Sequence, residues 1–106
     1  MTDVYLNLIA PALGSRIERN DAVSLEQSES DLDRIVKKTG VRSRHVVTEN
    51  EYTSDLALRA TNQLLLRTAG KVDEFDGLVV CTQTPDHLIP GVSSRVHGQL
   101  GFRKDC

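Results

Sequence analysis

The sequence is poor in aromatic residues and has little net charge. It has no tryptophan, two tyrosines and two phenylalanines in 106 residues, too few for a surface that stacks nucleic-acid bases. Its 13 basic and 15 acidic residues leave a formal net charge of −2, which argues against binding nucleic acid through bulk charge. No apolar run approaches the roughly 20 residues that cross a bilayer, and the N-terminus lacks the regions of a secretory signal. We therefore expect a soluble, cytoplasmic protein that binds neither nucleic acid nor membrane.

Cysteine is also scarce, and the motifs of the commonest reactions are missing. Cys81 and Cys106 are too few for a disulfide framework and too far apart for a CxxC metal or redox motif. Cys81 lies in an apolar run, where we expect a reduced core thiol. The sequence contains no GxGxxG, Walker A, HExxH or GxSxG motif. These absences remove the usual signatures of nucleotide, metal and serine-nucleophile chemistry.

Three histidines are present, and none has a second histidine or a carboxylate at metal-ligand spacing. They are His45, His87 and His97. The simplest interpretation of each is a surface or hydrogen-bonded residue. Asp86 and His87 are adjacent, but they fall in a turn, where sequence neighbours rarely form a catalytic dyad. We therefore predict no metal and no bound cofactor.

The hydrophobic patterning predicts alternating strands and helices in an α/β architecture, with layered helices on a mostly parallel sheet. Pro, Gly and helix-capping residues set the expected boundaries. The expected elements are a strand at 4–10, a loop at 11–20, a helix at 22–27, a helix at 31–39 ended by Gly40, a strand at 41–47, the longest helix from 53 to the glycine at 70, a buried parallel strand at 75–82 and a helix at 92–100.

The pattern also predicts an incomplete domain. The sequence stops directly after the last expected helix, where an α/β arrangement requires another strand. A strongly apolar parallel strand needs neighbours on both sides, and three strands do not supply them. We therefore interpret residues 1–106 as the front part of a larger α/β domain.

Basic residues gather in one short segment. Five of the 13 lie within eleven positions: Arg34, Lys37, Lys38, Arg42 and Arg44. Charges of this sign at a helix C-terminus complement the helix dipole and need no further role. The same cluster could dock a phosphate-bearing ligand or an acidic partner protein. The sequence leaves both interpretations open.

Four segments resemble β-ketoacyl-acyl-carrier-protein synthase III in order and spacing. They are SDLDRIVKKTGVRSRH at 30–45, TSDLA at 53–57, GLVVCTQTPDHLIP at 77–90 and QLG at 99–101. The resemblance covers roughly residues 20–101. It implies the thiolase fold, built from two duplicated βαβαβ halves that dimerise, and residues 1–106 would form an incomplete N-terminal part of the first half.

The resemblance also implies an activity and its partners. Members of this family load an acyl group from acyl-CoA onto a cysteine and join it, with decarboxylation, to malonyl-acyl-carrier protein. The family's nucleophile follows the next strand after Gly101, and its histidine and asparagine lie in the second half. Cys106 falls before the nucleophile position. We therefore expect no catalytic residue here, an inactive chain by itself, and a dimeric parent acyltransferase that uses acyl-CoA or a phosphopantetheine-bound acyl thioester as substrate.

Several family binding positions do fall inside the sequence. Ser30, Arg34 and Lys38 correspond to positions that grip the CoA nucleotide, although Arg34 replaces a common tryptophan and Lys38 an arginine. Gln83 corresponds to a position near the acyl pocket. Ile89 corresponds to a residue that crosses the dimer interface into the partner's pocket. The remaining basic residues are expected to dock the carrier protein: Lys37, Arg42 and Arg44.

The first 20 residues depart from the family pattern. This departure favours a specialised relative, from modified-lipid or polyketide biosynthesis, over the general fatty-acid enzyme. The competing hypothesis is a non-catalytic α/β module that binds an acidic carrier protein or a partner subunit. A silent truncated copy is a third possibility.

Overall fold

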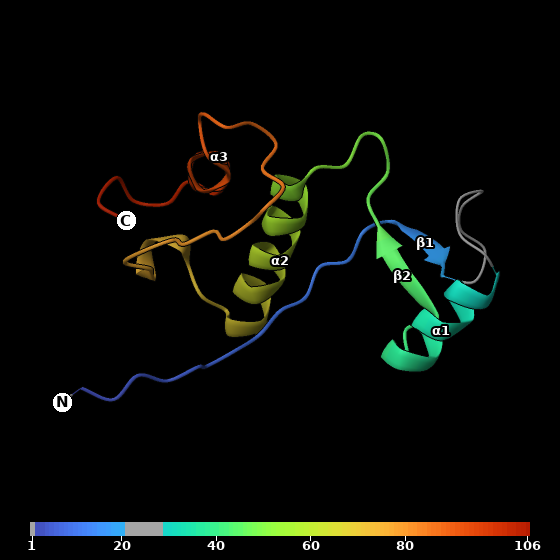
Figure 1. Ribbon diagram of the computed structural model, residues 1–106. Helices are drawn as coiled ribbons and strands as arrows, with labels where there is room; N and C mark the ends of the chain where they lie inside the picture. Colours follow the sequence, from blue (N-terminus) through green and yellow to red (C-terminus); the bar gives the residue numbers. More distant parts are fainter. Residues whose placement is uncertain (1, 21–28) are drawn as a thin grey trace. The chain divides into compact units, whose positions relative to one another are not determined.

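The computed structural model describes residues 2–20 and 29–106, and they form two compact units. One unit is Leu13–Asn50, and the other combines the residues up to Ala12 with Glu51–Cys106. The elements along the chain are β1 (Arg16–Arg19), α1 (Glu29–Thr39), β2 (Ser43–Val46), α2 (Thr53–Thr68), the 3-10 turn η1 (Val72–Glu74) and α3 (Val92–Leu100) (Figure 1).

In the first unit, β1 and β2 pair antiparallel, with Arg16 opposite Val46 and Arg19 opposite Ser43. The chain just before β1 passes very close to β2 at Gly14. A Cβ on this residue would lie 2.3 Å from the carbonyl carbon of Val46, so only glycine fits without a shift. The His45 ring donates from Nδ1 to the Gly14 carbonyl at 2.9 Å. This contact fixes the start of β1 against β2.

α1 ends as its sequence predicts. Its half-buried residues are Leu32 and Val36, one turn apart. Gly40 follows the helix with φ +71°, and its N–H donates to the Val36 carbonyl at 2.8 Å. A left-handed residue at this position is strained for any side chain with a Cβ, which is why glycine serves here. The predicted helix at 31–39 is confirmed and begins two residues earlier.

In the second unit, α2 packs against α3. The core lies under α3 and consists of Val92, Val96 and Phe102, with Val96 wholly buried. Phe102 contacts Phe75 edge to face, with ring centroids 6.2 Å apart, and stacks on His97 at 5.7 Å. α3 matches the predicted helix at 92–100 and ends at Gly101, with φ +71°. α2 matches the predicted longest helix, but its left-handed terminal residue is Ala69 rather than the glycine at 70.

Two predicted strands are wrong as elements of this structure. Residues 4–10 and 75–82 form no strand, and Val4 and Val79 are 96% and 92% exposed. Cys81 is likewise exposed rather than a core thiol. A strand exists through hydrogen bonds to neighbouring strands, and no strand among residues 2–20 and 29–106 pairs with either segment.

β1 is the converse case, because it forms inside the segment 11–20 that the sequence predicts to be a loop. Its short polar sequence RIER becomes a strand through pairing with β2. β2 confirms a strand within 41–47, although the sheet that it joins is antiparallel. The helix predicted at 22–27 lies outside the described residues. No helix in the described part of the chain has the length and apolar character needed to span a membrane.

Candidate functional site

The predicted basic cluster lies on α1 and on the segment that leads into β2. Lys37 and Lys38 lie three and four positions after Arg34 on α1, so both neighbour Arg34 on the helix surface, and all three are exposed. Ser30 lies in the first turn of this helix, and its side chain is outside the described part of the structure. Arg42 precedes β2 and is exposed as well. The structure therefore brings most of the predicted nucleotide-binding and docking residues onto one unit.

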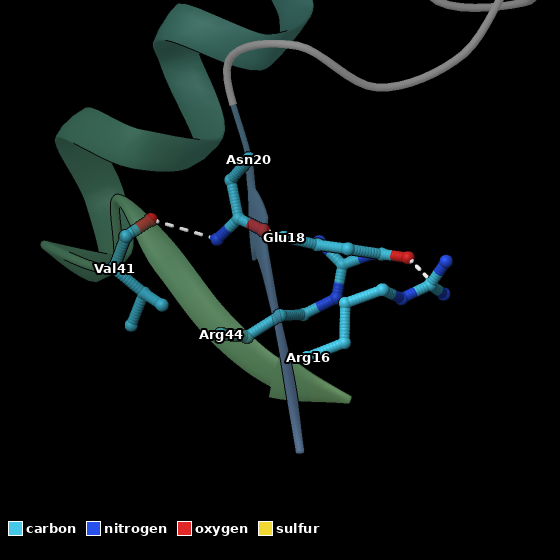
Figure 2. A network of polar contacts seen from close by, with 5 residues as sticks. All are labelled: Arg16, Glu18, Asn20, Val41 and Arg44. Carbon is cyan, nitrogen blue, oxygen red and sulfur yellow. Dashed lines mark hydrogen bonds and ion pairs between the residues drawn. The ribbon is translucent and has the colours of Figure 1, made fainter. Parts of the chain in front are cut away.

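Arg44 differs from the other basic residues because it is already paired. It lies opposite Glu18 across the β1–β2 ladder, and its Nη2 is 2.7 Å from Glu18 Oε2. It also donates to the side-chain oxygen of Asn20. The second oxygen of Glu18 accepts from Arg16 at 2.6 Å (Figure 2). Glu18 thus offsets part of the positive charge that Arg44 would offer to an anionic partner.

Asn20 holds the backbone at Arg42 in place through two hydrogen bonds. Its main-chain N–H donates to the Arg42 carbonyl at 2.8 Å, and its side-chain Nδ2 donates to the Val41 carbonyl at 2.8 Å (Figure 2). Both bonds cross from the end of β1 to the turn after α1. This turn is therefore held on the sheet at two points, which orders the base of the Arg42 side chain.

A hollow of about 250 Å³ opens beside this turn. Three basic side chains line it, one from β1, one from α1 and one from the turn, together with one carboxylate and one apolar side chain: Arg19, Lys37, Arg42, Asp33 and Val36. The balance of charge around the hollow is positive. Arg19 was not among the predicted site residues, because its segment was expected to be a loop. The pairing of Arg19 with Ser43 in the β1–β2 ladder brings it to the basic segment.

Four basic residues carry no internal counter-charge among the residues that the structure describes. Arg34, Lys37, Lys38 and Arg42 form no ion pair with the described side chains, which are those of residues 2–20 and 31–106. An exposed unpaired cation can meet a phosphate or carboxylate without first breaking an existing bridge. Chemically, this unit can bind an anion on α1 and at the adjoining hollow.

The other predicted site residues, Gln83 and Ile89, belong to the unit that contains Glu51–Cys106. Both are exposed, Ile89 by 91%. They lie on the irregular segment between η1 and α3, which is fastened to the N-terminus of α2. The Thr53 hydroxyl donates to the Thr84 carbonyl at 2.6 Å. The Ser54 N–H donates to Asp86 Oδ1 at 3.1 Å.

The Asp86 carboxyl has a pKa that its surroundings shift. Its side chain is 4% exposed, and Arg95 Nη1 lies 3.0 Å from its Oδ2. Burial raises the pKa of Asp86, but hydrogen bonding by Ser54, and then the charges of Arg95 and His87, outweigh burial and hold the pKa below its ordinary value of 3.8. Asp86 is therefore an ionised carboxylate with a buried side chain, and it joins this segment to α2 and to Arg95.

Two of the three histidines contact the backbone, and one cysteine lines a hollow. His97 donates from Nε2 to the Arg103 carbonyl at 2.8 Å, as His45 does to Gly14, so two histidines are hydrogen-bonded to the backbone as expected. Cys106 lines a hollow of about 270 Å³ together with His97. No group of three or more His, Cys, Asp or Glu in the described part could hold a metal ion.

Comparison with known proteins identifies the fold class first. No family model matches the chain. A 3-oxoacyl-(acyl-carrier protein) synthase from Burkholderia xenovorans superposes with a TM-score of 0.80 at 25% identity, over 92% of this chain and 29% of that one. OleA from Xanthomonas campestris superposes with a TM-score of 0.75 at 17% identity, which supports the fold alone. The chain therefore has the fold of a thiolase-superfamily segment.

The sequence comparisons identify a family within this fold class. A β-ketoacyl-[acyl-carrier-protein] synthase III from Levilactobacillus brevis is 39% identical over 100 residues, 92% of this chain and 30% of that protein. The synthase III structure from Thermus thermophilus is 34% identical, with a TM-score of 0.76. The resemblance to β-ketoacyl-acyl-carrier-protein synthase III is thus confirmed, and the chain spans about 30% of the length of these curated relatives.

Proposed function

We propose that this chain is the N-terminal, ligand-binding part of a ketosynthase III-like acyltransferase. The observation that carries the proposal is the 39% identity to a synthase III over 92% of the chain. The parent protein would load an acyl group from acyl-CoA, or from a phosphopantetheine-bound thioester, onto a cysteine outside these residues. It would then condense that group, with loss of carbon dioxide, with malonyl-carrier protein for fatty-acid, specialised-lipid or polyketide synthesis.

Within that reaction, α1 would bind and orient the thioester donor. Arg34 and Lys38 are one helical turn apart, exposed and without an internal counter-charge among the described residues, so they suit the phosphates of a CoA nucleotide. Arg34 can also stack its guanidinium plane on an adenine. Lys38 supplies a point charge without the bidentate geometry of arginine.

The hollow beside α1 would receive the acidic surface of the carrier protein. Lys37 and Arg42 line it, and Asn20 orders the turn that carries Arg42. Arg44 would contribute less, because Glu18 already accepts a hydrogen bond from it. Gln83 and Ile89 would shape the acyl pocket of a homodimeric cytoplasmic enzyme, in which Ile89 reaches the partner subunit.

The first experiment tests the activity itself. The full-length protein that contains this sequence is incubated with acyl-CoA or acyl-carrier protein, and intact-protein mass spectrometry follows acyl addition to a cysteine. We expect one acyl group for each chain, and a 3-oxoacyl product after malonyl-carrier protein is added. If no cysteine takes up an acyl group from either donor, the acyltransferase hypothesis is wrong and a non-catalytic carrier-binding module becomes the better interpretation.

A second experiment tests the residue assignment. Arg34→Ala and Lys38→Ala should each weaken acyl-CoA binding roughly 2- to 5-fold, which is the range of exposed ion pairs, and should reduce its dependence on salt. Lys104→Ala is the matched control, because Lys104 is exposed and lies outside the α1 unit. If all three variants bind acyl-CoA with equal affinity, Arg34 and Lys38 only complement the helix dipole and do not bind the nucleotide.

A further inference from the structure

The segment at 82–91 carries both residues of the proposed acyl pocket, yet it has no regular secondary structure. Gln83 and Ile89 are exposed, and neither side chain makes a hydrogen bond or ion pair with the described part of the chain. Their own contacts therefore do not hold them in place. Whatever fixes the backbone between them determines where the two side chains lie.

Two contacts fasten this segment to the first turn of α2. The Thr53 hydroxyl donates to the Thr84 carbonyl at 2.6 Å, and Thr84 N–H donates to the Thr82 hydroxyl at 3.0 Å. Asp86 Oδ1 accepts from the Ser54 N–H at 3.1 Å. The first N–H groups of a helix have no partner inside it, so a carboxylate from outside the helix satisfies one of them and lies at the favourable end of the dipole.

A third contact ties the same carboxylate to α3. Arg95 Nη1 lies 3.0 Å from Asp86 Oδ2, and Arg95 Nη2 lies 3.8 Å from Asp55 Oδ1 in α2. The Asp86 side chain is 4% exposed and Ser54 is wholly buried, so the carboxylate is shielded from water, whereas the Arg95 side chain is 36% exposed. A buried carboxylate that lost either partner would be poorly satisfied, so both partners hold it in one position.

Asp86 stands midway between the two pocket residues, three positions after Gln83 and three before Ile89. We propose that Asp86 is a positioning residue that, with Arg95, holds the 82–91 segment against α2 and thereby sets the acyl-chain length that the pocket accepts. This inference rests on the proposed function for its substrate class. We call the contacts of Asp86 with Ser54 and Arg95 the clamp, and they lie entirely within this unit.

The substrate half of the proposal is tested in the full-length protein with a series of straight-chain acyl-CoA donors. A well-formed apolar pocket separates neighbouring chain lengths by roughly 10-fold or more for each methylene. Asp86→Ala removes both contacts, and Arg95→Gln removes the ion pair alone. We expect both variants to bring the kcat/KM values of neighbouring chain lengths closer together, with the loss falling on KM for the preferred donor. Asp105→Asn is the control, since this exposed carboxylate pairs with Arg103 away from the segment.

The contacts of Asp86 are tested separately by hydrogen exchange in the full-length protein that contains this sequence. Asp86→Ala should speed exchange at the Ser54 and Thr84 amides and leave the amides in the middle of α2 unchanged. If Asp86→Ala does not fold, Arg95→Gln gives the same comparison with a smaller change. Unchanged exchange at Ser54 and Thr84 refutes the clamp. Unchanged chain-length ratios in an active enzyme refute the selectivity role. A wild-type protein that takes up no acyl group refutes the proposed function, and with it the selectivity role, while exchange still decides the clamp.

Discussion

Replacing Gly14 by alanine tests whether the close approach of the chain to β2 organises the Leu13–Asn50 unit, which carries the basic cluster. A Cβ at this position would meet the Val46 carbonyl carbon and oxygen at 2.3 Å and the Val47 nitrogen at 2.8 Å. All three are backbone atoms, so no side chain can rotate away. Forcing a methyl group into a well-packed site costs about 1–3 kcal/mol. Because the clash involves backbone, we expect the upper part of that range.

The matched control is Gly98→Ala in α3. A Cβ at Gly98 meets nothing within 4 Å, and the residue lies inside a helix, where alanine is favoured over glycine by about 1 kcal/mol. The same glycine-to-alanine change should therefore destabilise at one position and stabilise at the other. Urea unfolding followed by circular dichroism measures both changes in the free energy of unfolding.

The consequence for the site is separate from global stability. Gly14→Ala should displace β2 and disrupt the hydrogen bond from His45 to the Gly14 carbonyl. Amide exchange at 43–46 should therefore quicken by more than exchange in α3. If Gly14→Ala proves as stable as the wild type and leaves exchange in β2 unchanged, the close contact between residue 14 and β2 does not exist as described.

Three further predictions follow from the buried and paired groups. Because the pKa of Asp86 is lowered in the folded state, its carboxylate contributes its full stabilisation above the pKa of an unfolded aspartate, about 3.9, and this contribution is lost as the pH falls through the lowered pKa. Asp86→Asn cannot titrate at this position. In thermal melts below about pH 4, the variant should therefore lose less stability with falling pH than the wild type does. Glu18→Gln should free Arg44 and tighten binding of a holo-carrier protein roughly 2-fold at low salt, measured by calorimetry; weaker binding would contradict the charge-offset argument. Val96→Ala empties a wholly buried position and should lower the free energy of unfolding by about 2–3 kcal/mol, and a loss below 0.5 kcal/mol would show that this core does not form.

The helices could be predicted from the sequence because their signals are local. α1 carries apolar residues one turn apart and a glycine after its last turn, and φ at Gly40 is +71°. α3 shows the same pattern with Gly101. Helix hydrogen bonds join residues four apart, so the segment that forms a helix contains most of the information for it. The boundaries were accordingly correct to within two residues.

The strands could not be predicted in the same way. The apolar run at 75–82 has the composition of a buried parallel strand, but a strand needs partners elsewhere in the sequence, and the chain spans about 30% of its curated relatives. β1 shows the reverse, since RIER carries almost no strand signal and forms through its register with β2. Strand prediction fails here because the deciding interactions are not local.

The basic segment shows why residue type alone did not assign roles. The sequence gives no reason to assign different roles to the five basic residues within these eleven positions. In the structure they differ in the side chains that lie near each of them. Arg44 faces Glu18 across the ladder and is offset, whereas Arg42 stands on a turn that Asn20 orders beside an open hollow. A paired arginine holds two strands together, whereas Arg42, which has no ion pair among the described side chains, stands on an ordered backbone and can meet a ligand with little loss of entropy. The docking role should therefore fall more on Arg42 than on Arg44, although both residues have the same charge and lie two positions apart.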